Sequence, residues 1–349
     1  MTRRWVNRPE GSNWGDFGPE DELGRLNLLT PERVRRAVEE VREGRTFCLS
    51  LPLDYPGGNL LNPRRHPPQR FATIRQGKPN YNFPLEWEEA DFTDVVSDDA
   101  VLLHTQYSTQ WDALSHVGGL FDADGDGEPE VVYYNGWRGG EDVVGPSEPH
   151  DHAEAGPCSP YEGVEAKRLG IQNMAQKAVQ GRGVLVDLRR HLGDERTRVG
   201  YDQLMRVMEA DDVRVEEGDL LCLHTGFADV VLGMRREPDV DRLNASCAAL
   251  DGRDRKLQAW IADSGIACLI ADNYAVEDYP AAPGEGRHPA LPLHELCLFK
   301  LGIHLGELWY LTDLAAWLHQ HRRSRFLLTA PPLRLPGAVG SPATPVATV

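Results

Sequence analysis

The sequence predicts an α/β fold. Beyond residue 163, segments with apolar residues at helical spacing alternate with short, wholly apolar segments that are typical of buried strands. Helices are expected at residues 164–180, 201–210 and 253–264, and strands at residues 183–188, 219–224 and 266–271. Ligands in such folds bind beyond the carboxyl ends of the strands, so His224, Asp272 and Asn273 are candidates to line a pocket.

The composition narrows the classes of partner. The chain has 349 residues, 41% of them hydrophobic, and its formal net charge of -17 argues against nucleic acid or an anionic membrane as the main partner. The N-terminus lacks the apolar region of a signal peptide, and no segment has the roughly eighteen apolar residues of a membrane span. A cytoplasmic protein with a small-molecule substrate is expected. The scattered cysteines have no Cys-x-x-Cys pair and read as reduced core residues: Cys48, Cys158, Cys222, Cys247, Cys268 and Cys297.

The first 45 residues are expected to form an arm and a helix that pack on a catalytic domain of residues 46–349. Residues 11–30 are rich in glycine and turn formers, yet Trp14 and Phe17 need burial. Thr30 as N-cap and Pro31 at the first helical position begin a helix that Gly44 ends. A strand follows at residues 46–53.

Residues 54–89 form a long irregular segment. This segment is rich in Pro, Arg, Asn and Gly and carries Tyr81, Phe83 and Trp87. Long loops in compact domains are usually functional or disordered, and the aromatic residues favour a loop that covers a pocket. A contact between two copies of the chain is an equal alternative.

The segment from Leu103 to His116 carries more side-chain chemistry than any other. It follows an apolar lead-in, ends before Gly118-Gly119 and reads as extended. In a strand, alternate residues share one face, so the expected face comprises Gln106, Ser108, Gln110, Asp112, Leu114 and His116. Such a face is either a site or a solvated edge of a sheet, and the apolar lead-in favours a site.

An acidic turn follows this segment. Asp122, Asp124 and Asp126 imitate the start of a calcium loop, but its twelfth position is Tyr133 and no helices flank it. A solvated turn is the better interpretation.

The C-terminal third carries the remaining candidates. After a loop at 283–292, residues 291–301 look helical and carry His294, which has no second histidine four residues later as a zincin helix requires. Glu307 ends the next segment, a strand is expected at 326–329, and the proline-rich tail from residue 330 is expected to be extended. Asp112, His116, His294 and Glu307 are ligand types suited to Zn²⁺ or Mn²⁺, although each is also compatible with an ordinary structural role.

Several common catalytic motifs are missing from the sequence. No Gly-x-Ser-x-Gly elbow, P-loop or Gly-x-Gly-x-x-Gly stands between a strand and a helix, so serine hydrolase, NTPase and dinucleotide-binding functions lack specific support.

The central segment resembles the signature of the metal-dependent cyclase family, which includes bacterial kynurenine formamidase and isatin hydrolase. The signature is His-x-Gly-Thr-His-x-Asp-x-x-x-His, and here it stands as Gln-Tyr-Ser-Thr-Gln-Trp-Asp-Ala-Leu-Ser-His at residues 106–116. Further resemblances follow in order along nearly the whole chain: Asn13 to Pro31, Gly218 to Phe227, Asp272 to Glu277, His294 and Glu307.

The resemblance implies a swivelling β/β/α fold, a homodimer or higher oligomer, and one or two divalent metals. Carried over by position, the metal places are Gln106, Gln110, Asp112, His116, His294 and Glu307. Glutamine stands at two histidine positions of the signature, 106 and 110, and the glutamine carboxamide is a neutral and poor donor for Zn²⁺. The resemblance therefore implies one Mn²⁺ or Zn²⁺ held by Asp112, His116, His294 and Glu307, with a metal-free variant as an alternative.

The sequence leads to the hypothesis of a hydrolase. Its substrate would have an amide, lactam, formamide, lactone or ester bond in a small, cyclic or aromatic molecule. His116 would be the general base, Gln106 and Gln110 would donate to the oxyanion, and Trp111 would line the pocket with Asp272 and Asn273. Two alternatives stay open: a metal-independent cyclase or dehydratase that uses Gln106, Gln110, Asp112 and His116, and a non-catalytic binding relic.

Overall fold

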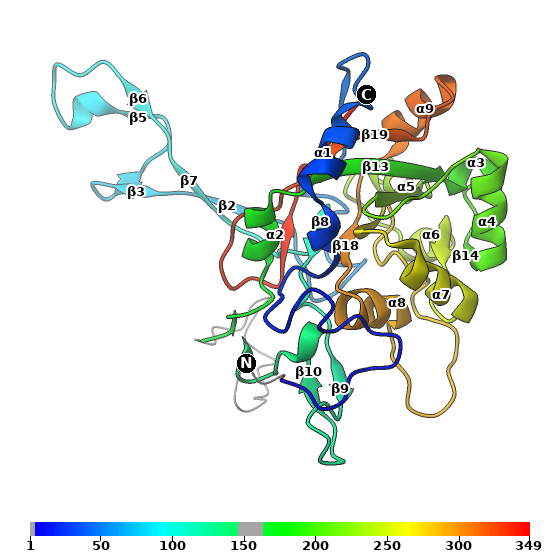
Figure 1. Ribbon diagram of the computed structural model, residues 1–349. Coiled ribbons are helices and arrows are strands. Elements are labelled where there is room, and N and C mark those ends of the chain that lie inside the picture. Colours follow the sequence, from blue (N-terminus) through cyan, green and yellow to red (C-terminus); the bar gives the residue numbers. More distant parts are fainter. Residues whose placement is uncertain (1–3, 146–162) are drawn as a thin grey trace.

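A mixed sheet organises the protein. The computed structural model describes residues 4–145 and 163–349 (Figure 1), which contain a nine-stranded sheet of order β1-β21-β19-β13-β15-β17-β18-β8-β20. Its central strands run parallel, in agreement with the predicted α/β fold: β13 (Gln180–Asp187), β15 (Leu220–His224), β17 (Cys268–Ala271) and β18 (His304–Glu307). The carboxyl ends of these four strands therefore lie along one edge of the sheet.

Antiparallel strands extend the sheet on both sides. Beyond β18 lie β8 (Gln110–Asp112) and β20 (Gly340–Pro342), and beyond β13 lie β19 (Arg325–Thr329), β21 (Val346–Thr348) and β1 (Thr46–Cys48). The tail that the sequence predicted as merely extended thus contributes two strands. Pro342 ends β20, which is an edge strand of the sheet, and Pro345 precedes β21, so neither proline interrupts the interior of a strand.

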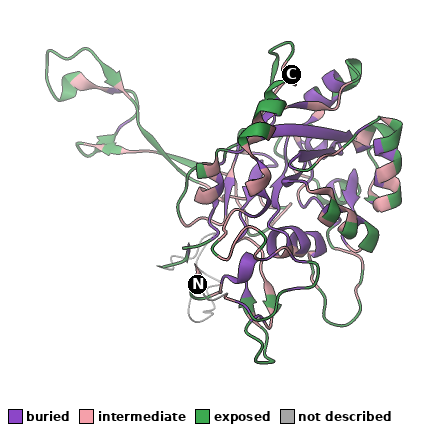
Figure 2. Cartoon of the chain, viewed as in Figure 1, coloured by how far each residue is buried: buried purple, intermediate pink, exposed green. Residues whose placement is uncertain are grey.

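The central strands of the sheet are buried (Figure 2), and apolar side chains cover both of its faces. Along β15, Leu221 and Leu223 pack into one core with Leu204 of α4 (Tyr201–Ala210) and Leu257 of α7 (Arg255–Ser264). Leu220 and Cys222 point the other way, into a second core with α9 (Thr312–Gln320). Burial on both faces explains why these strands read as continuous apolar segments.

Shorter elements complete the fold. The remaining helices are η1 (Gly24–Leu28), α2 (Ile171–Lys177), α3 (Leu188–Leu192), α5 (Phe227–Gly233), α6 (Val240–Asn244), the α8 turn (Pro292–His294), the π-helical turn η4 (Glu295–Lys300), η2 (Leu85–Trp87) and η3 (Tyr134–Gly136). Two-stranded pairs join β9 (Gly119–Phe121) to β10 (Glu130–Val132), β11 (Val143–Val144) to β12 (Glu165–Ala166), and β14 (Thr197–Val199) to β16 (Ala248–Leu250). None of the helices in the described ranges has the length and apolar character for a membrane crossing.

The N-terminal segment packs on the body as expected. Thr30 caps α1 (Pro31–Val38) by accepting a hydrogen bond from the Arg33 amide, which is 3.4 Å away. The helix ends at Val38 instead of Gly44. Further upstream, the Trp14 indole donates to the Phe299 carbonyl oxygen at 2.8 Å and is 1% exposed. A domain boundary at residue 46 stays a prediction.

Residues 69–102 form an arm that projects from the body (Figures 1 and 2). It consists of three strand pairs: β2 (Gln69–Ala72) with β7 (Asp99–Leu102), β3 (Ile74–Arg75) with β4 (Lys78–Pro79), and β5 (Phe83–Pro84) with β6 (Val95–Val96). Phe83 packs on Trp87 within the arm, at 4.9 Å between ring centroids. The aromatic residues expected over a pocket therefore lie on the projecting arm, because hairpin pairing carries them outward.

Other expected elements are shorter than predicted. The helix expected at 164–180 is reduced to α2, and the strand expected at 46–53 to β1. The extended segment at 103–116 is a strand only in β8, because turns occupy residues 105–108 and 114–117. Five cysteines are unbonded thiols, and Cys158 lies outside the described residues.

Candidate active site

Two neighbouring strands bring three polar side chains together. In the β8–β18 register, Gln110 lies opposite Glu307 and Asp112 opposite Leu305. Because residues two apart share a face, Gln110 and Asp112 point to the same side of the sheet. The Gln110 amide nitrogen donates to Glu307 Oε2 at 2.9 Å, and it lies 3.4 Å from Asp112 Oδ1. All three side chains are buried.

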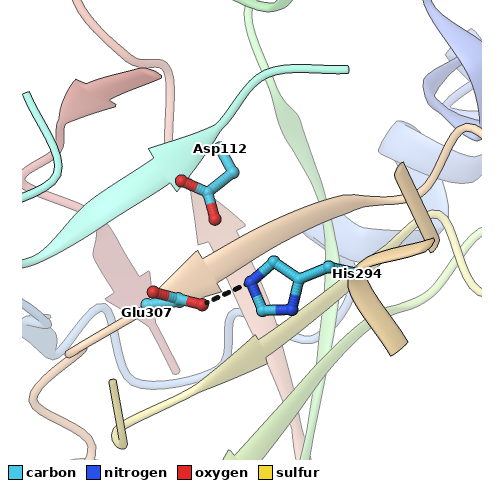
Figure 3. A group of neighbouring side chains, drawn as sticks. All are labelled: Asp112, His294 and Glu307. Carbon is cyan, nitrogen blue, oxygen red and sulfur yellow. Dashed lines mark ion pairs between the residues drawn. The ribbon is translucent and has the colours of Figure 1, made fainter. Parts of the chain in front are cut away.

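His294 completes this cluster from the α8 turn (Figure 3). Its Nε2 faces Glu307 Oε1 at 3.2 Å, and its Nδ1 is 2.8 Å from Glu277 Oε1. Glu277 also accepts the backbone N–H groups of Leu293 and His294 at 3.0 Å, which fixes its carboxylate at the start of the turn. Glu277 thus orients the imidazole and leaves Nε2 directed at Asp112 and Glu307 (Figure 3).

Burial and charge shift the pKa values in this cluster in different directions. Burial lowers the pKa of His294, but its contacts with Glu277 and Glu307 outweigh burial and raise the pKa to about 10. Burial and the negative charge of Asp112 raise the pKa of Glu307 to about 7, against the opposing charges of His294 and Arg65. The cluster therefore holds a proton tightly in the absence of another cation.

His116 lies beside the cluster on a turn that follows β8. Its backbone N–H donates to the Ala113 carbonyl oxygen, and its Nε2 is 3.9 Å from Asp112 Oδ1. Burial lowers the pKa of His116, and the charges of His294 and Arg65 lower it further against the effect of Asp112. The imidazole is therefore neutral near pH 7, which is the form that accepts a proton.

A cavity of about 350 Å³ opens onto these groups. The polar residues that reach it include Gln106, His116, His294 and Glu307. Residues 56–65 form one wall, so the expected pocket cover is correct for this part of the 54–89 segment alone. Tyr107, Tyr274 and Leu291 give the cavity apolar surface. This combination of apolar walls and a few convergent polar groups is typical of small-molecule sites.

The donor set fits one divalent cation. Ligand atoms of Asp112, His294 and Glu307 all lie within 4.8 Å of one another. Asp112 Oδ2 and Gln110 Oε1 are buried and, within the described residues, accept no hydrogen bond. Buried polar atoms without partners are costly unless a ligand satisfies them. One imidazole and two carboxylates match the preferences of Zn²⁺ and Mn²⁺, while His116 lies outside this three-ligand group.

The structure corrects the expected role of Trp111. Its side chain points to the opposite face of β8, donates to the Ala330 carbonyl oxygen at 2.8 Å and packs on Trp309. It is fully buried in the second core. Strand alternation places Trp111 away from Gln110 and Asp112, so it does not line the pocket.

Asp272 and Asn273 also hold the fold instead of lining the pocket. Asp272 accepts hydrogen bonds from the Thr225 amide and hydroxyl and from the Gly226 amide, at 2.6–2.7 Å. Asn273 donates to the carbonyl oxygens of Ala248 and Val276. Both side chains are buried and join loops at the strand ends, and neither lines the cavity described above, so their expected contact with substrate stays a prediction.

The two glutamines have different surroundings. Gln106 lines the cavity and accepts from the Thr105 hydroxyl at 2.7 Å, while its amide nitrogen is buried beside Gly340 and has no partner within the described residues. The amide nitrogen of Gln110 already donates to Glu307, and its side chain is fully buried. The expected oxyanion donor is therefore compatible with Gln106, whereas Gln110 orients Glu307.

Two site residues had no assigned role at the sequence level. Glu277 belongs to the segment that resembles the family, but its contact with His294 depends on a fold that joins positions 17 residues apart. Arg65 lines the cavity from the 54–89 segment, and no local pattern in the sequence distinguishes it from Arg64 or Arg70. Only the tertiary contacts reveal either residue.

The carboxylates of the acidic turn accept hydrogen bonds from backbone amides of the same turn. Asp122 accepts the amides of Gly125 and Gly127 at 2.7 and 3.1 Å, and Asp126 accepts that of Glu128. Ligand atoms of Asp122, Asp124 and Asp126 lie within 4.8 Å of one another, but Asp124 and Asp126 are exposed. The interpretation as a solvated acidic turn stays a prediction.

The Cyclase family model matches residues 49–278, which is more than half of the chain. This chain belongs to the cyclase family. A solved structure described as a novel cyclase shares 30% sequence identity with it and has a TM-score of 0.73, covering 97% of this chain and 99% of its own. The family assignment and the fold expected from the resemblance are thus confirmed.

More distant cyclase-like structures share the fold. Isatin hydrolase A from Labrenzia aggregata, bound to benzyl benzoate, has 13% identity and a TM-score of 0.53, with 87% of this chain and 93% of its own covered. Isatin hydrolase A from Ralstonia solanacearum has the same identity and TM-score, with 87% and 91% covered. No curated protein matches the sequence significantly.

Proposed function

We propose that this cyclase-family chain is a metal-assisted hydrolase of a carbon–nitrogen or ester bond in a small cyclic or aryl-bearing substrate. The observation that carries this proposal is the convergence of Asp112, His294 and Glu307 beside a cavity. His294 and Glu307 line this cavity together with the neutral His116. Membership of the family and the isatin hydrolase neighbours support the same reaction class.

Asp112, His294 and Glu307 would hold one Mn²⁺ or Zn²⁺. Such an ion would polarise the carbonyl group of the substrate and would lower the pKa of a water molecule bound to it. Glu277 orients the His294 ring, and Gln110 orients Glu307 through its amide hydrogen bond. These two contacts hold the donor atoms in place, which matters because ligand orientation strongly affects metal affinity.

His116 would move the proton during hydrolysis. Its Nε2 takes a proton from the attacking water and then delivers it to the leaving nitrogen or oxygen as the bond to the acyl carbon breaks. Gln106 would direct its unpartnered amide N–H groups at the oxygen that gains negative charge. Gly340 permits this position, because a Cβ there would come within 2.4 Å of the Gln106 amide nitrogen.

Metal content and turnover test this proposal together. Protein purified without chelators or an affinity metal should contain about one Mn²⁺ or Zn²⁺ per chain and hydrolyse members of a lactam, formamide and lactone panel. Asp112→Ala should lose both, whereas Asp122→Ala in the acidic turn should keep both. Stoichiometric metal in Asp112→Ala would contradict the ligand assignment.

A metal-independent reaction is a second candidate. Its support is that the neutral His116 and Glu307, whose pKa of about 7 suits proton transfer, line the same cavity. Gln106, Gln110, Asp112 and His116 would then run a dehydration or ring closure. Turnover by protein that holds no metal, even after dialysis against Mn²⁺ and Zn²⁺, would favour this candidate. Neither metal nor turnover would favour a binding relic.

We also propose that the chain forms a homodimer or higher oligomer through its projecting arm. Two-stranded segments are marginally stable alone, and the arm exposes large apolar side chains, among them Phe71 (53%), Ile74 (70%) and Val95 (59%). Sedimentation should give a mass above the 38.9 kDa of one chain. Ile74→Glu should shift the equilibrium towards the monomer, and a monomeric wild type would contradict the proposal.

A further inference from the structure

Arg65 carries a positive charge at the cavity and forms no direct ion pair with a carboxylate of the described residues, although its charge acts on Glu307 through space. Its Nη1 donates to the Gln106 carbonyl oxygen at 2.8 Å, and within residues 4–145 and 163–349 it forms no ion pair. By contrast, Arg182 pairs with Asp219, and Arg196 with Asp278. Most donors of the Arg65 guanidinium are therefore available beside the cavity that it lines.

The loop that carries Arg65 is held firmly against the body. The Tyr107 hydroxyl donates to the Gly58 carbonyl oxygen at 2.8 Å and accepts the Gly57 amide at 3.0 Å. Gly57 has φ +93°, and a Cβ there would come within 2.2 Å of the Arg236 carbonyl oxygen. Because the loop approaches the body this closely, Arg65 faces the cavity from a fixed support.

The cavity separates two kinds of charge. Glu307 lines the cavity near His294, with Asp112 in the same buried cluster, whereas Arg65 lies on the loop wall and is partly exposed. Leu61, Tyr279 and Leu291 add apolar surface to the same cavity. A guanidinium presents a planar fork of N–H donors that matches the two oxygens of a carboxylate. A substrate that carries an apolar ring and a carboxylate would complement this arrangement.

We propose that Arg65 is a specificity-determining residue that binds a carboxylate of the substrate, away from the bond that is hydrolysed. The substrate class is thereby narrowed to anionic, aryl-bearing amides, lactams or esters. This inference rests on the proposed hydrolase function for the reaction, but the preference for a carboxylate is a binding property. It can therefore be measured without turnover.

Calorimetric titration with benzoate and its neutral isostere benzamide tests the inference on the metal-loaded protein. Wild type should bind benzoate more tightly than benzamide. Arg65→Met should weaken benzoate binding about 10- to 100-fold, the loss expected for one charge-assisted contact, and leave benzamide unchanged. Arg206→Met, which removes one exposed charge from α4, is the matched control and should bind both probes as wild type does. Arg65→Lys should recover part of the loss, because it restores the charge without the fork.

The outcomes separate recognition from a merely structural role. If Arg65 only braces the Gln106 turn, Arg65→Met will lower the melting temperature and weaken both probes alike, which overturns the inference. Equal benzoate binding by wild type and Arg65→Met also overturns it, and that result includes benzoate bound only through the metal. No preference of wild type for benzoate over benzamide has the same consequence.

Turnover provides a second and independent readout. For pairs of aryl esters that differ only by a ring carboxylate or carboxamide, Arg65→Met should raise KM for the carboxylate member and leave kcat nearly unchanged. If no variant hydrolyses any ester or amide, the proposed function fails while the benzoate titration still decides the role of Arg65.

Discussion

Two histidine–carboxylate groups lie at the same edge of the central sheet, and they differ in how fully their polar atoms are used. In the candidate site, His294 meets Asp112 and Glu307, and Asp112 Oδ2 has no partner within the described residues. In the second group, His224 contacts Asp187 at 2.8 Å and the Thr312 hydroxyl at 3.2 Å. The second carboxylate of this group is Asp272, whose Oδ2 lies 4.0 Å from His224 Nε2.

The comparison shows that residue type alone does not identify a site. Both groups combine an imidazole with two carboxylates at strand ends. The sequence made residues of both groups candidates for a site. The His224 group is saturated, because Asp272 accepts three hydrogen bonds and both ring nitrogens of His224 have partners. The His294 group keeps acceptor atoms unused and opens to a cavity. Unused donors and acceptors mark the group that has room for a ligand.

The largest effect is expected from His116→Ala. Loss of a general base should lower kcat/KM about 10²- to 10⁴-fold, while the melting temperature stays near that of wild type. His191→Ala, which removes an exposed histidine paired with Asp211, is the control and should keep full activity. Undiminished turnover by His116→Ala would remove this residue from the mechanism.

The second prediction contrasts the two groups in stability. Asp272→Ala leaves three buried donors of Thr225 and Gly226 without an acceptor and should lower the free energy of unfolding by about 3–5 kcal/mol. In metal-free protein, Asp112→Asn keeps the side-chain shape and relieves repulsion with Glu307, so its effect should stay below about 1 kcal/mol. Urea denaturation measures both, and equal losses would contradict the distinction between a saturated and an unsaturated group.

The third prediction concerns pH. Burial lowers the pKa of His224, but Asp187 and Asp272 outweigh burial and raise it above 6.5. Burial raises the pKa of Asp187, but His224 outweighs burial and lowers it below 3.8. The His224 contribution is fully present below pH 6.5 and is lost as pH rises through the folded-state pKa; the Asp187 contribution is present above pH 3.8 and is lost as pH falls through its folded-state pKa.

The pair should therefore stabilise the fold most between pH 3.8 and 6.5. In His224→Asn, the free energy of unfolding should be lower in this window and should vary less with pH on either side of it. Urea denaturation across the range gives the curves. Parallel curves for wild type and variant would show that this pair does not contribute to the pH dependence.

The smallest effect is expected at the acidic turn. This third group of carboxylates accepts hydrogen bonds from its own backbone amides. Calcium at about 1 mM, the weak end of known calcium modules, should leave the melting temperature of the wild type unchanged. Asp124→Asn serves as the comparison, because Asp124 is exposed. A calcium-dependent rise that Asp124→Asn abolishes would make this turn a cation site.

Local patterns predicted the parts of the fold that depend on local physics. The Thr30 cap, the α4 helix and the apolar strands β15 and β17 are where the sequence placed them, within two residues. Caps, helical spacing and continuous apolar segments depend on residues that are close in the sequence. The elements that they predict are therefore found in the folded chain. The ends of α1 and α2 were missed, since tertiary packing decides where a weak helix stops.

The sequence by itself determined the α/β class, the family resemblance and the presence of Gln110, Asp112, His116, His294 and Glu307 as candidates. The tertiary structure decided which of them meet: β8 pairs with β18, and Glu277 turns His294 towards Glu307. It also assigned Trp111 and Asp272 to the fold and brought Arg65 to the cavity. The physical reason is that strand register and long-range contacts set the direction of each side chain, and neither is encoded in local spacing.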